Sequence, residues 1–167
     1  MTSPEDMPGL DNVRPLKPGE EPAVDLLLRA AFPGPEEAGL VCQLRTDGDM
    51  AQEKVLEWEG RIIGYFALSS MVAPQDWLCL APVAVHPDWQ RKGQGRMMMG
   101  LLCEWAKTAG RYVVVLGQVG FYQSGGFSLA RAARLTSPYP IRNTLLAGPD
   151  RDVPVETLQY ARAFDGL

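Results

Sequence analysis

The chain has 167 residues, of which 46% are hydrophobic and 22% charged, and its net charge is −4. This length and apolar content allow one domain with a substantial core and leave little room for two. A negative chain argues against general binding to nucleic acid or to an acidic membrane, so any site for an anion has to be local. We therefore expect a single domain over residues 1–167, with its core at about 12–164.

The cysteines and the single histidine bear on disulfide and metal chemistry. Cys42, Cys79 and Cys103 are odd in number and far apart, which indicates neither a disulfide framework nor a zinc site. Each lies among apolar neighbours, so we expect buried thiols in a reducing compartment. With one histidine and no cluster of cysteine and histidine, we expect no bound metal.

The first residues give no targeting signal. Residues 1–10 are polar, with two prolines and two acids, and lack the basic and apolar regions of a signal peptide. No stretch approaches the roughly 18 apolar residues of a membrane-spanning helix. We therefore expect a cytoplasmic protein without a membrane partner.

The first third of the chain is predicted to form a short strand and two helices. Apolar residues recur at helical spacing in two segments, which Phe32-Pro33-Gly34-Pro35 separates. Acids at the start of each segment suit a helix N-terminus. The expected elements are a strand at 12–16 and helices at 20–32 and 36–45.

From residue 51 the pattern changes to one typical of strands. Two such segments flank Glu59-Gly60, a tight-turn signal, and predict a hairpin. A third strand leads through a glycine-spaced turn into a helix that Gly110 ends, and a β-branched strand follows. A strand–helix–strand unit of this length is right-handed, so its strands are parallel. The expected elements are strands at 54–58, 61–68, 77–85 and 112–116 and a helix at 96–109.

The helix at 96–109 is expected to pack on the sheet along one apolar stripe. The predicted stripe is Met97, Met98, Leu101, Leu102 and Trp105, with Met99 exposed. Beyond it, 117–126 predicts a loop with one helical turn, and 127–135 and 154–161 predict strands that the intervening Ser137-Pro138-Tyr139-Pro140 cannot continue. Together these elements predict one mixed α/β domain.

The turn at Gln90–Gly95 has the features of an anion site. It joins a strand to a helix N-terminus, where unpaired N–H groups and the positive end of the helix dipole attract phosphate. Its glycines allow positive φ or close approach to a ligand, and Arg91, Lys92 and Arg96 add positive charge. A dinucleotide fingerprint would need glycine at 98, and a P-loop would need Gly-Lys-Ser/Thr; neither is present. For the glycine spacing alone, an ordinary turn with solubilising basic residues is the alternative.

A longer pattern gives the turn a context. Val83-x-Val85-x-Pro87-x-x-Gln90-Arg91-Lys92-Gly93-x-Gly95, followed by a helix and a strand, resembles the acetyl-CoA-binding segment of the GNAT N-acetyltransferase superfamily. The segments Gly117–Phe127 and Ser137–Pro140 resemble its bacterial YhbS-type branch. The resemblance implies a mixed, mostly antiparallel sheet with a central parallel pair flanked by helices.

The resemblance also implies the residues that hold the cofactor. The N–H groups of the turn would bind the CoA pyrophosphate, and the pantetheine arm would pair with the preceding strand like an added strand. Pro82 lacks an N–H, which fits an interruption of the strand pairing there, and an ordinary irregularity at the strand end is the alternative. The implied cofactor residues are Val83, Ala84, Val85, Gln90, Arg91, Lys92, Gly93, Gln94, Gly95 and Arg96.

Two proton-transfer groups are expected in such an enzyme. By resemblance, Tyr122 is the general acid that protonates the departing thiolate, although its ring could simply pack under the loop. No general base is identified: the candidates are solvated carboxylates or a water relay, and His86 is expected to be structural. Arg131 and Arg134 could line the acceptor cleft, and the alternative is that they are solvated surface residues. The candidate carboxylates are Glu36, Glu37, Glu53, Glu57, Glu59 and Asp76.

The resemblance implies an acetyl-CoA-dependent N-acetyltransferase acting on a primary amine of an unknown small molecule or protein. The negative chain favours a cationic or neutral amine. A non-catalytic acyl-CoA-binding sensor is the alternative, and an α/β domain without a ligand is a third reading. Dimers are common in the superfamily, so a homodimer is compatible with the resemblance.

Overall fold

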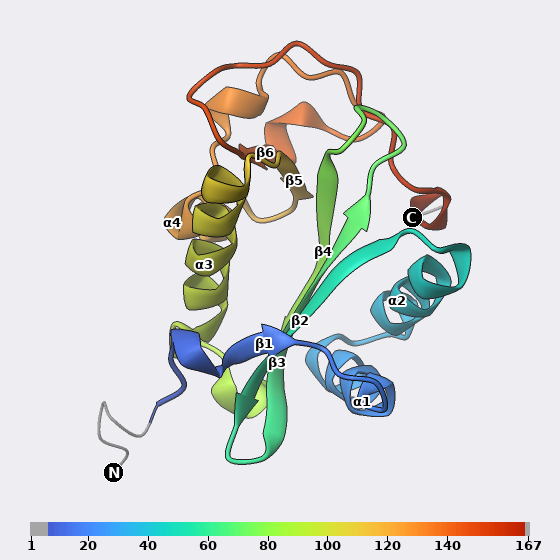
Figure 1. Cartoon of the computed structure of the whole chain (residues 1–167), viewed down its shortest axis with the longest axis vertical. Coiled ribbons are helices and arrows are strands. Elements are labelled where there is room, and N and C mark those ends of the chain that lie inside the picture. Colours follow the sequence, from blue (N-terminus) through green and yellow to red (C-terminus); the bar gives the residue numbers. More distant parts are fainter. Residues whose placement is uncertain (1–6, 166–167) are drawn as a thin grey trace.

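The computed structural model describes residues 7–165, which form a six-stranded sheet with helices on both faces (Figure 1). Residues 1–6, where the sequence predicts no targeting signal, and 166–167 lie outside the described range. All neighbouring strands are antiparallel except β4 and β5, which are parallel as predicted. The strands lie in chain order: β1 (Val13–Pro15), β2 (Met50–Trp58), β3 (Arg61–Ser70), β4 (Leu78–Val85), β5 (Val113–Leu116) and β6 (Thr144–Ala147).

The helices divide between the two faces of the sheet. α1 (Glu21–Ala31) and α2 (Glu36–Asp47) lie on one side, and α3 (Gln94–Ala109) and α4 (Val119–Gly125) on the other (Figure 1). The side chains of β4 alternate accordingly: Cys79 packs in the cluster with α2, whereas Leu80 packs in the cluster with α3. Short 3-10 turns lie at Leu10–Asn12 (η2), Pro87–Trp89 (η3), Ala130–Ala132 (η4), Ile141–Asn143 (η5) and Arg162–Phe164 (η6).

The buried stripe of α3 differs from the predicted one. Its buried side chains include Met99, which was expected to be exposed, while Met97, Leu101 and Trp105 are only half-buried. The reason is α4, because a Cβ at Gly125 would lie 2.5 Å from the Cβ of Met99. The prediction considered only the sheet, and the second helix extends the buried face. The buried residues are Gln94, Met98, Met99, Leu102 and Ala106.

The C-terminal third departs most from the prediction. Within the described residues, segments 127–135 and 154–161 do not form strands; the first contains η4, and the second makes isolated bridges to Thr136 and Ala73. The sixth strand is instead Thr144–Ala147, which is fully buried and pairs with β5. A four-residue strand is too short for a periodic pattern to reveal it. The apolar residues of 127–135 cover its edge, where Ser128 bridges to Leu146.

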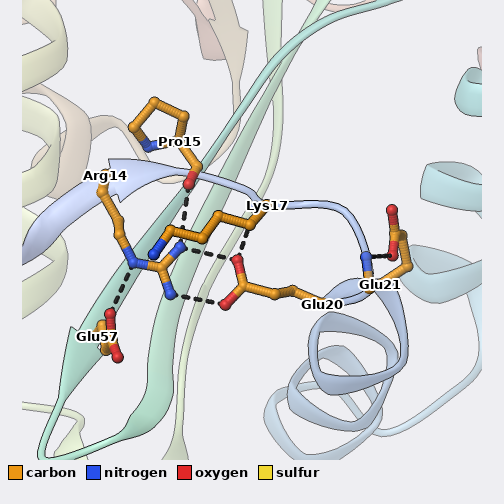
Figure 2. A network of polar contacts seen from close by, with 7 residues as sticks. Arg14, Pro15, Lys17, Glu20, Glu21 and Glu57 are labelled. Atoms are coloured by element: carbon orange, nitrogen blue, oxygen red, sulfur yellow. Dashed lines mark hydrogen bonds and ion pairs between the residues drawn. The ribbon is translucent and has the colours of Figure 1, made fainter.

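Arg14 ties the first strand to α1 and β2 (Figure 2). Its guanidinium donates to Oε2 of Glu57 at 2.7 Å and to the two carboxylate oxygens of Glu20 at 2.8 and 2.6 Å. The N–H of Lys17 donates to Glu20 at 2.7 Å. The hydrogen bonds from Arg14, and then from Lys17, lower the pKa of Glu20 to about 2. This network fixes the start of α1, whose far end reaches the candidate site.

Candidate active site

The two central strands separate beside the glycine-spaced turn. β4 and β5 pair at Leu78–Leu80 with Val113–Val115. On the other side of β4, Phe66 pairs with Val83 and Leu68 with Leu80, so β4 carries one extra residue, a bulge at Ala81–Pro82. The interruption expected at Pro82 is therefore confirmed. Beyond the bulge, no described strand pairs with β4 on its β5 side.

The turn after β4 leaves the N-terminus of α3 uncapped by any side chain of the described residues. Gly93 is the N-cap at φ 83°, and Arg91 has φ 64°, so both adopt the left-handed region. Nε2 of Gln90 donates to the carbonyl of Val85 at 2.9 Å, which ties the turn back to the strand. The first N–H groups of α3 have no acceptor within the helix, so they are available to an anion.

The second glycine of the motif has a different task from the first. A Cβ at Gly95 would lie 3.0 Å from Cζ of Phe121. Glycine at this position therefore lets the first turn of α3 lie against the ring of Phe121 in α4. Only Gly93 of this pair is required for positive φ.

A cavity of about 720 Å³, here called the turn cavity, lies between the turn, β4 and α4. It gathers most of the predicted cofactor residues together with Tyr122. Ala84 and Lys92 are not among its lining residues: Ala84 is buried against α1, and Nζ of Lys92 lies 5.2 Å from the ring centre of Trp89. The predicted residues that line it are Val83, Val85, Gln90, Arg91, Gly93, Gln94, Gly95, Arg96 and Tyr122.

The turn cavity also has walls that the sequence did not assign. Gln118 follows the end of β5, and ligands in α/β sheets commonly bind at the carboxyl ends of parallel strands, a signal that could have identified it. Phe32 comes from the end of α1, and nothing in the local sequence links it to the turn. The unassigned lining residues are Phe32, Trp89, Gly117, Gln118, Phe121 and Ser124.

Tyr122 both packs and lines the turn cavity. Its ring makes edge contacts with Phe121 and Phe127 at centroid distances of 5.0 and 5.8 Å. A Cβ at Gly117 would lie 2.9 Å from Cε2 of Tyr122, so glycine is needed beside the ring. Burial raises the pKa of Tyr122 to about 12, and the phenol is therefore protonated at neutral pH. Packing and a role in the cavity are thus compatible.

The candidate bases separate into paired and unpaired groups. Glu53 accepts from Arg45 at 2.7 Å and from the hydroxyl of Tyr65 at 2.6 Å. Glu57 is bound by Arg14. These carboxylates hold the fold together and do not line the turn cavity.

The remaining candidates differ in position. Glu59 and Asp76 lie in turns at positive φ. Nδ1 of His86 accepts from the N–H of Asp88 at 3.2 Å, in agreement with a structural role. Arg131, proposed for the acceptor cleft, pairs with Asp152 at 3.1 Å. Glu36 and Glu37 line a second cavity.

Residues 7–165 contain no group of three or more His, Cys, Asp or Glu side chains placed to hold a metal ion. Among the helices of the same range, none is long and apolar enough to cross a membrane.

A mixed sheet whose central parallel pair separates beside an uncapped helix N-terminus is the architecture of the N-acetyltransferases. Residues 23–127 match the family described as Acetyltransferase (GNAT). Over 131 residues the chain is 37% identical to the uncharacterised N-acetyltransferase YhbS of Escherichia coli strain K12, covering 74% of this chain and 77% of that protein. The chain belongs to the acetyltransferase (GNAT) family.

Two solved structures extend the likeness to three dimensions. The GNAT family N-acetyltransferase YhbS from Escherichia coli in complex with CoA has a TM-score of 0.82 and 28% identity, over 91% of this chain and 90% of that one. A GNAT family acetyltransferase from Brucella melitensis in complex with acetyl-CoA has a TM-score of 0.73 and 25% identity, over 92% and 97%. The predicted family and fold are confirmed.

Proposed function

We propose that this protein transfers the acetyl group of acetyl-CoA to a primary amine. The observation that carries the proposal is the separation of β4 from β5 directly beside the turn cavity. A parallel pair that opens there exposes main-chain groups of β4 for an extended ligand, and the turn offers N–H groups to its phosphates. The similar structures that contain CoA or acetyl-CoA support this choice of ligand.

In this proposal the turn and the strand hold opposite ends of the cofactor. The N–H groups of residues 91–96 bind the pyrophosphate, with Arg91 and Arg96 adding charge. The pantetheine arm pairs with β4 at Val83 and Val85, so the thioester lies near the bulge. An N–H of β4 then polarises the thioester carbonyl.

The reaction needs little covalent help from the protein. The neutral amine attacks the carbonyl carbon, a C–N bond forms, and the C–S bond breaks with its electron pair on sulfur. The phenol of Tyr122, with a pKa of about 12, is a weaker acid than a thiol of about 8.5. Tyr122 therefore stabilises the departing sulfur by a hydrogen bond, and the thiolate takes its proton from water.

Two measurements test the proposal in sequence. Acetyl-CoA at about a hundred times its Kd stabilises the folded state by roughly 2.7 kcal/mol, which thermal unfolding detects. Free-thiol release with amines then separates an enzyme from an acyl-CoA sensor. An unmoved melting temperature at millimolar acetyl-CoA contradicts both readings, and stabilisation without thiol release favours the sensor.

Location and assembly complete the proposal. The expected burial of the thiols holds for Cys79 but is wrong for Cys42, which is exposed, and for Cys103, which is half-buried. All three thiols are free, which suits a reducing compartment, and we place the protein in the cytoplasm. A homodimer stays a prediction, which light scattering of the purified protein checks.

A further inference from the structure

A second cavity, of about 360 Å³, lies where α2, the bulged part of β4 and the C-terminal segment meet. We call it the α2 cavity. Its walls include Glu37 and Leu40 from α2, Cys79 and Pro82 from β4, and Tyr160 and Phe164 from the C-terminal segment. Its size is that of a pocket for a small molecule.

The α2 cavity adjoins the turn cavity at the opening between β4 and β5. Along β4, Pro82 lines the α2 cavity and the next residue, Val83, lines the turn cavity. After β5, Leu116 lines the α2 cavity and the next residue, Gly117, lines the turn cavity. The two cavities therefore have walls from adjacent residues on both edges of the opening, which is where the proposed function puts the thioester.

Two polar groups of the α2 cavity are buried without a partner. Oε2 of Glu37 and the hydroxyl of Tyr160 have no partner with hydrogen-bond geometry among the described residues, although the hydroxyl of Ser137 lies close enough to Tyr160 to lower its pKa slightly against the effect of burial. The side chain of Tyr160 is only 8% exposed. Buried polar groups are normally satisfied, so this pair indicates a ligand with a hydrogen-bond donor. Burial also raises the pKa of Tyr160, so its hydroxyl stays neutral.

The remaining walls are apolar and aromatic. The ring of Tyr160 makes an edge contact with the ring of Tyr139 at a centroid distance of 5.0 Å, and its centroid lies 5.8 Å from that of the Phe164 ring. Tyr139 is fixed by a 3.0 Å hydrogen bond from its hydroxyl to the carbonyl of Phe164. No described residue that lines the cavity is basic. A ligand with an anionic group would therefore meet a carboxylate and no counter-charge.

We infer that the α2 cavity binds the acetyl acceptor, a small primary amine on an alkyl or arylalkyl body without an anionic group, and that Glu37 is the base that takes its proton. This inference rests on the proposed function and deepens it. The aromatic walls hold the apolar body, and the ammonium group donates to Oε2 of Glu37.

The proton and electron balance follows. The bound ammonium gives one proton to the carboxylate of Glu37, which passes it to solvent. The neutral amine then forms the C–N bond at the thioester carbonyl carbon, and the C–S bond breaks with its electron pair on sulfur. The second proton of the nitrogen passes to water, and the thiolate takes its proton from water. The products are a secondary amide and the CoA thiol, with Tyr160 close enough to the cavity to orient the nitrogen by its hydroxyl.

The test compares amines and variants by free-thiol release. With the unaltered protein, 2-phenylethylamine and hexylamine are expected to give a kcat/KM at least about tenfold above lysine and a lysine-containing peptide. Glu37→Gln is expected to lower kcat/KM for 2-phenylethylamine at least about 100-fold, the contribution of a general base. Tyr160→Phe keeps the ring and is expected to lower it about tenfold. Glu104→Gln, at an exposed position of α3, is the charge-matched control and should change it less than twofold.

The outcomes separate this inference from the function on which it rests. If acetyl-CoA still raises the melting temperature but the apolar amines are not turned over, or lysine or the peptide is preferred, the acceptor class is wrong and cofactor binding stands. Full activity of Glu37→Gln contradicts the role of Glu37. A loss of acetyl-CoA stabilisation in the unaltered protein contradicts the proposed function itself.

Discussion

The turn cavity and the α2 cavity differ in how the chain builds them. Most walls of the turn cavity come from one continuous stretch, residues 83–96, and use main-chain groups and basic side chains. The walls of the α2 cavity come from five separate stretches between residues 36 and 164 and are apolar apart from carboxylates, a thiol and phenols. One site is thus suited to a ligand that is the same in many proteins, and the other to a ligand that is particular to this chain.

Among these predictions, the largest effect on acetyl-CoA binding in the turn cavity is expected at Gly93. Gly93→Ala forces a side chain into the left-handed region and should cost about 1 kcal/mol of stability and raise the Kd for acetyl-CoA at least about tenfold. Gly110→Ala is the matched control, because Gly110 ends the same helix at φ 69° with open space around its Cβ. It should cost similar stability and leave the Kd unchanged. Calorimetric titration and thermal unfolding measure both; equal losses of affinity would refute a local role for Gly93.

A substitution of Tyr122 tests the reactive end of the turn cavity. Tyr122→Phe should lower kcat about tenfold without changing the Kd for acetyl-CoA, because only a hydrogen bond to the departing sulfur is lost. Since the pKa of Tyr122 is about 12, the phenol is protonated below that pH, and the rate should show no falling limb from it between pH 6 and pH 10. The measurement is the reaction rate as a function of pH for the unaltered protein and for Tyr122→Phe. A limb near pH 10 that is absent from the variant would mean that Tyr122 titrates normally.

A substitution of Arg96 tests whether positive charge contributes only to binding in the turn cavity. Arg96→Gln should weaken acetyl-CoA about fivefold at low salt, and the difference should shrink as salt screens the exposed charge. Lys107→Gln, in the last turn of the same helix, is the control with the same change of charge. Binding of the amine acceptor should not respond to either. If Lys107→Gln weakens acetyl-CoA equally, the effect is one of overall charge.

The smallest effect concerns a network remote from both cavities. Glu20→Gln removes the partner of Arg14 and should lower the melting temperature slightly at neutral pH while leaving the Kd for acetyl-CoA unchanged. Because the pKa of Glu20 is depressed to about 2, its stabilisation is present above the unfolded value near 4.5 and is lost as the pH falls through 2. The two proteins should therefore differ less at pH 2 than at neutral pH and melt together only at about pH 1. A difference that persists there would exclude this ion pair as its cause.

The same contrast explains what the sequence could reveal. The turn cavity depends on a contiguous motif, so the residues from Val83 to Arg96 could be assigned from the resemblance of that motif to the family's acetyl-CoA-binding segment. Even there, Lys92 turns to Trp89 and Ala84 faces α1, because side-chain direction depends on tertiary packing. Phe32 could not be linked to the turn from the sequence, because its position beside the turn also depends on tertiary packing.

The α2 cavity could not be predicted in this way. Glu37 was one of six equivalent carboxylates until the structure showed which ones are paired and which one is buried without a partner. The strand predicted at 154–161 is wrong, because isolated bridges and a 3-10 turn leave no period in the sequence. Tyr160 and Phe164 line the cavity because this irregular C-terminal segment places them there.

The most direct test of the account is a crystal structure of the protein with CoA and 2-phenylethylamine. We expect the pyrophosphate on the N–H groups at the start of α3, the sulfur at the opening between β4 and β5, and the amine nitrogen beside the carboxylate of Glu37. An amine bound on the α3 side with the cofactor, or a CoA that does not enter the turn cavity, would contradict the central claim that two cavities meet at this opening.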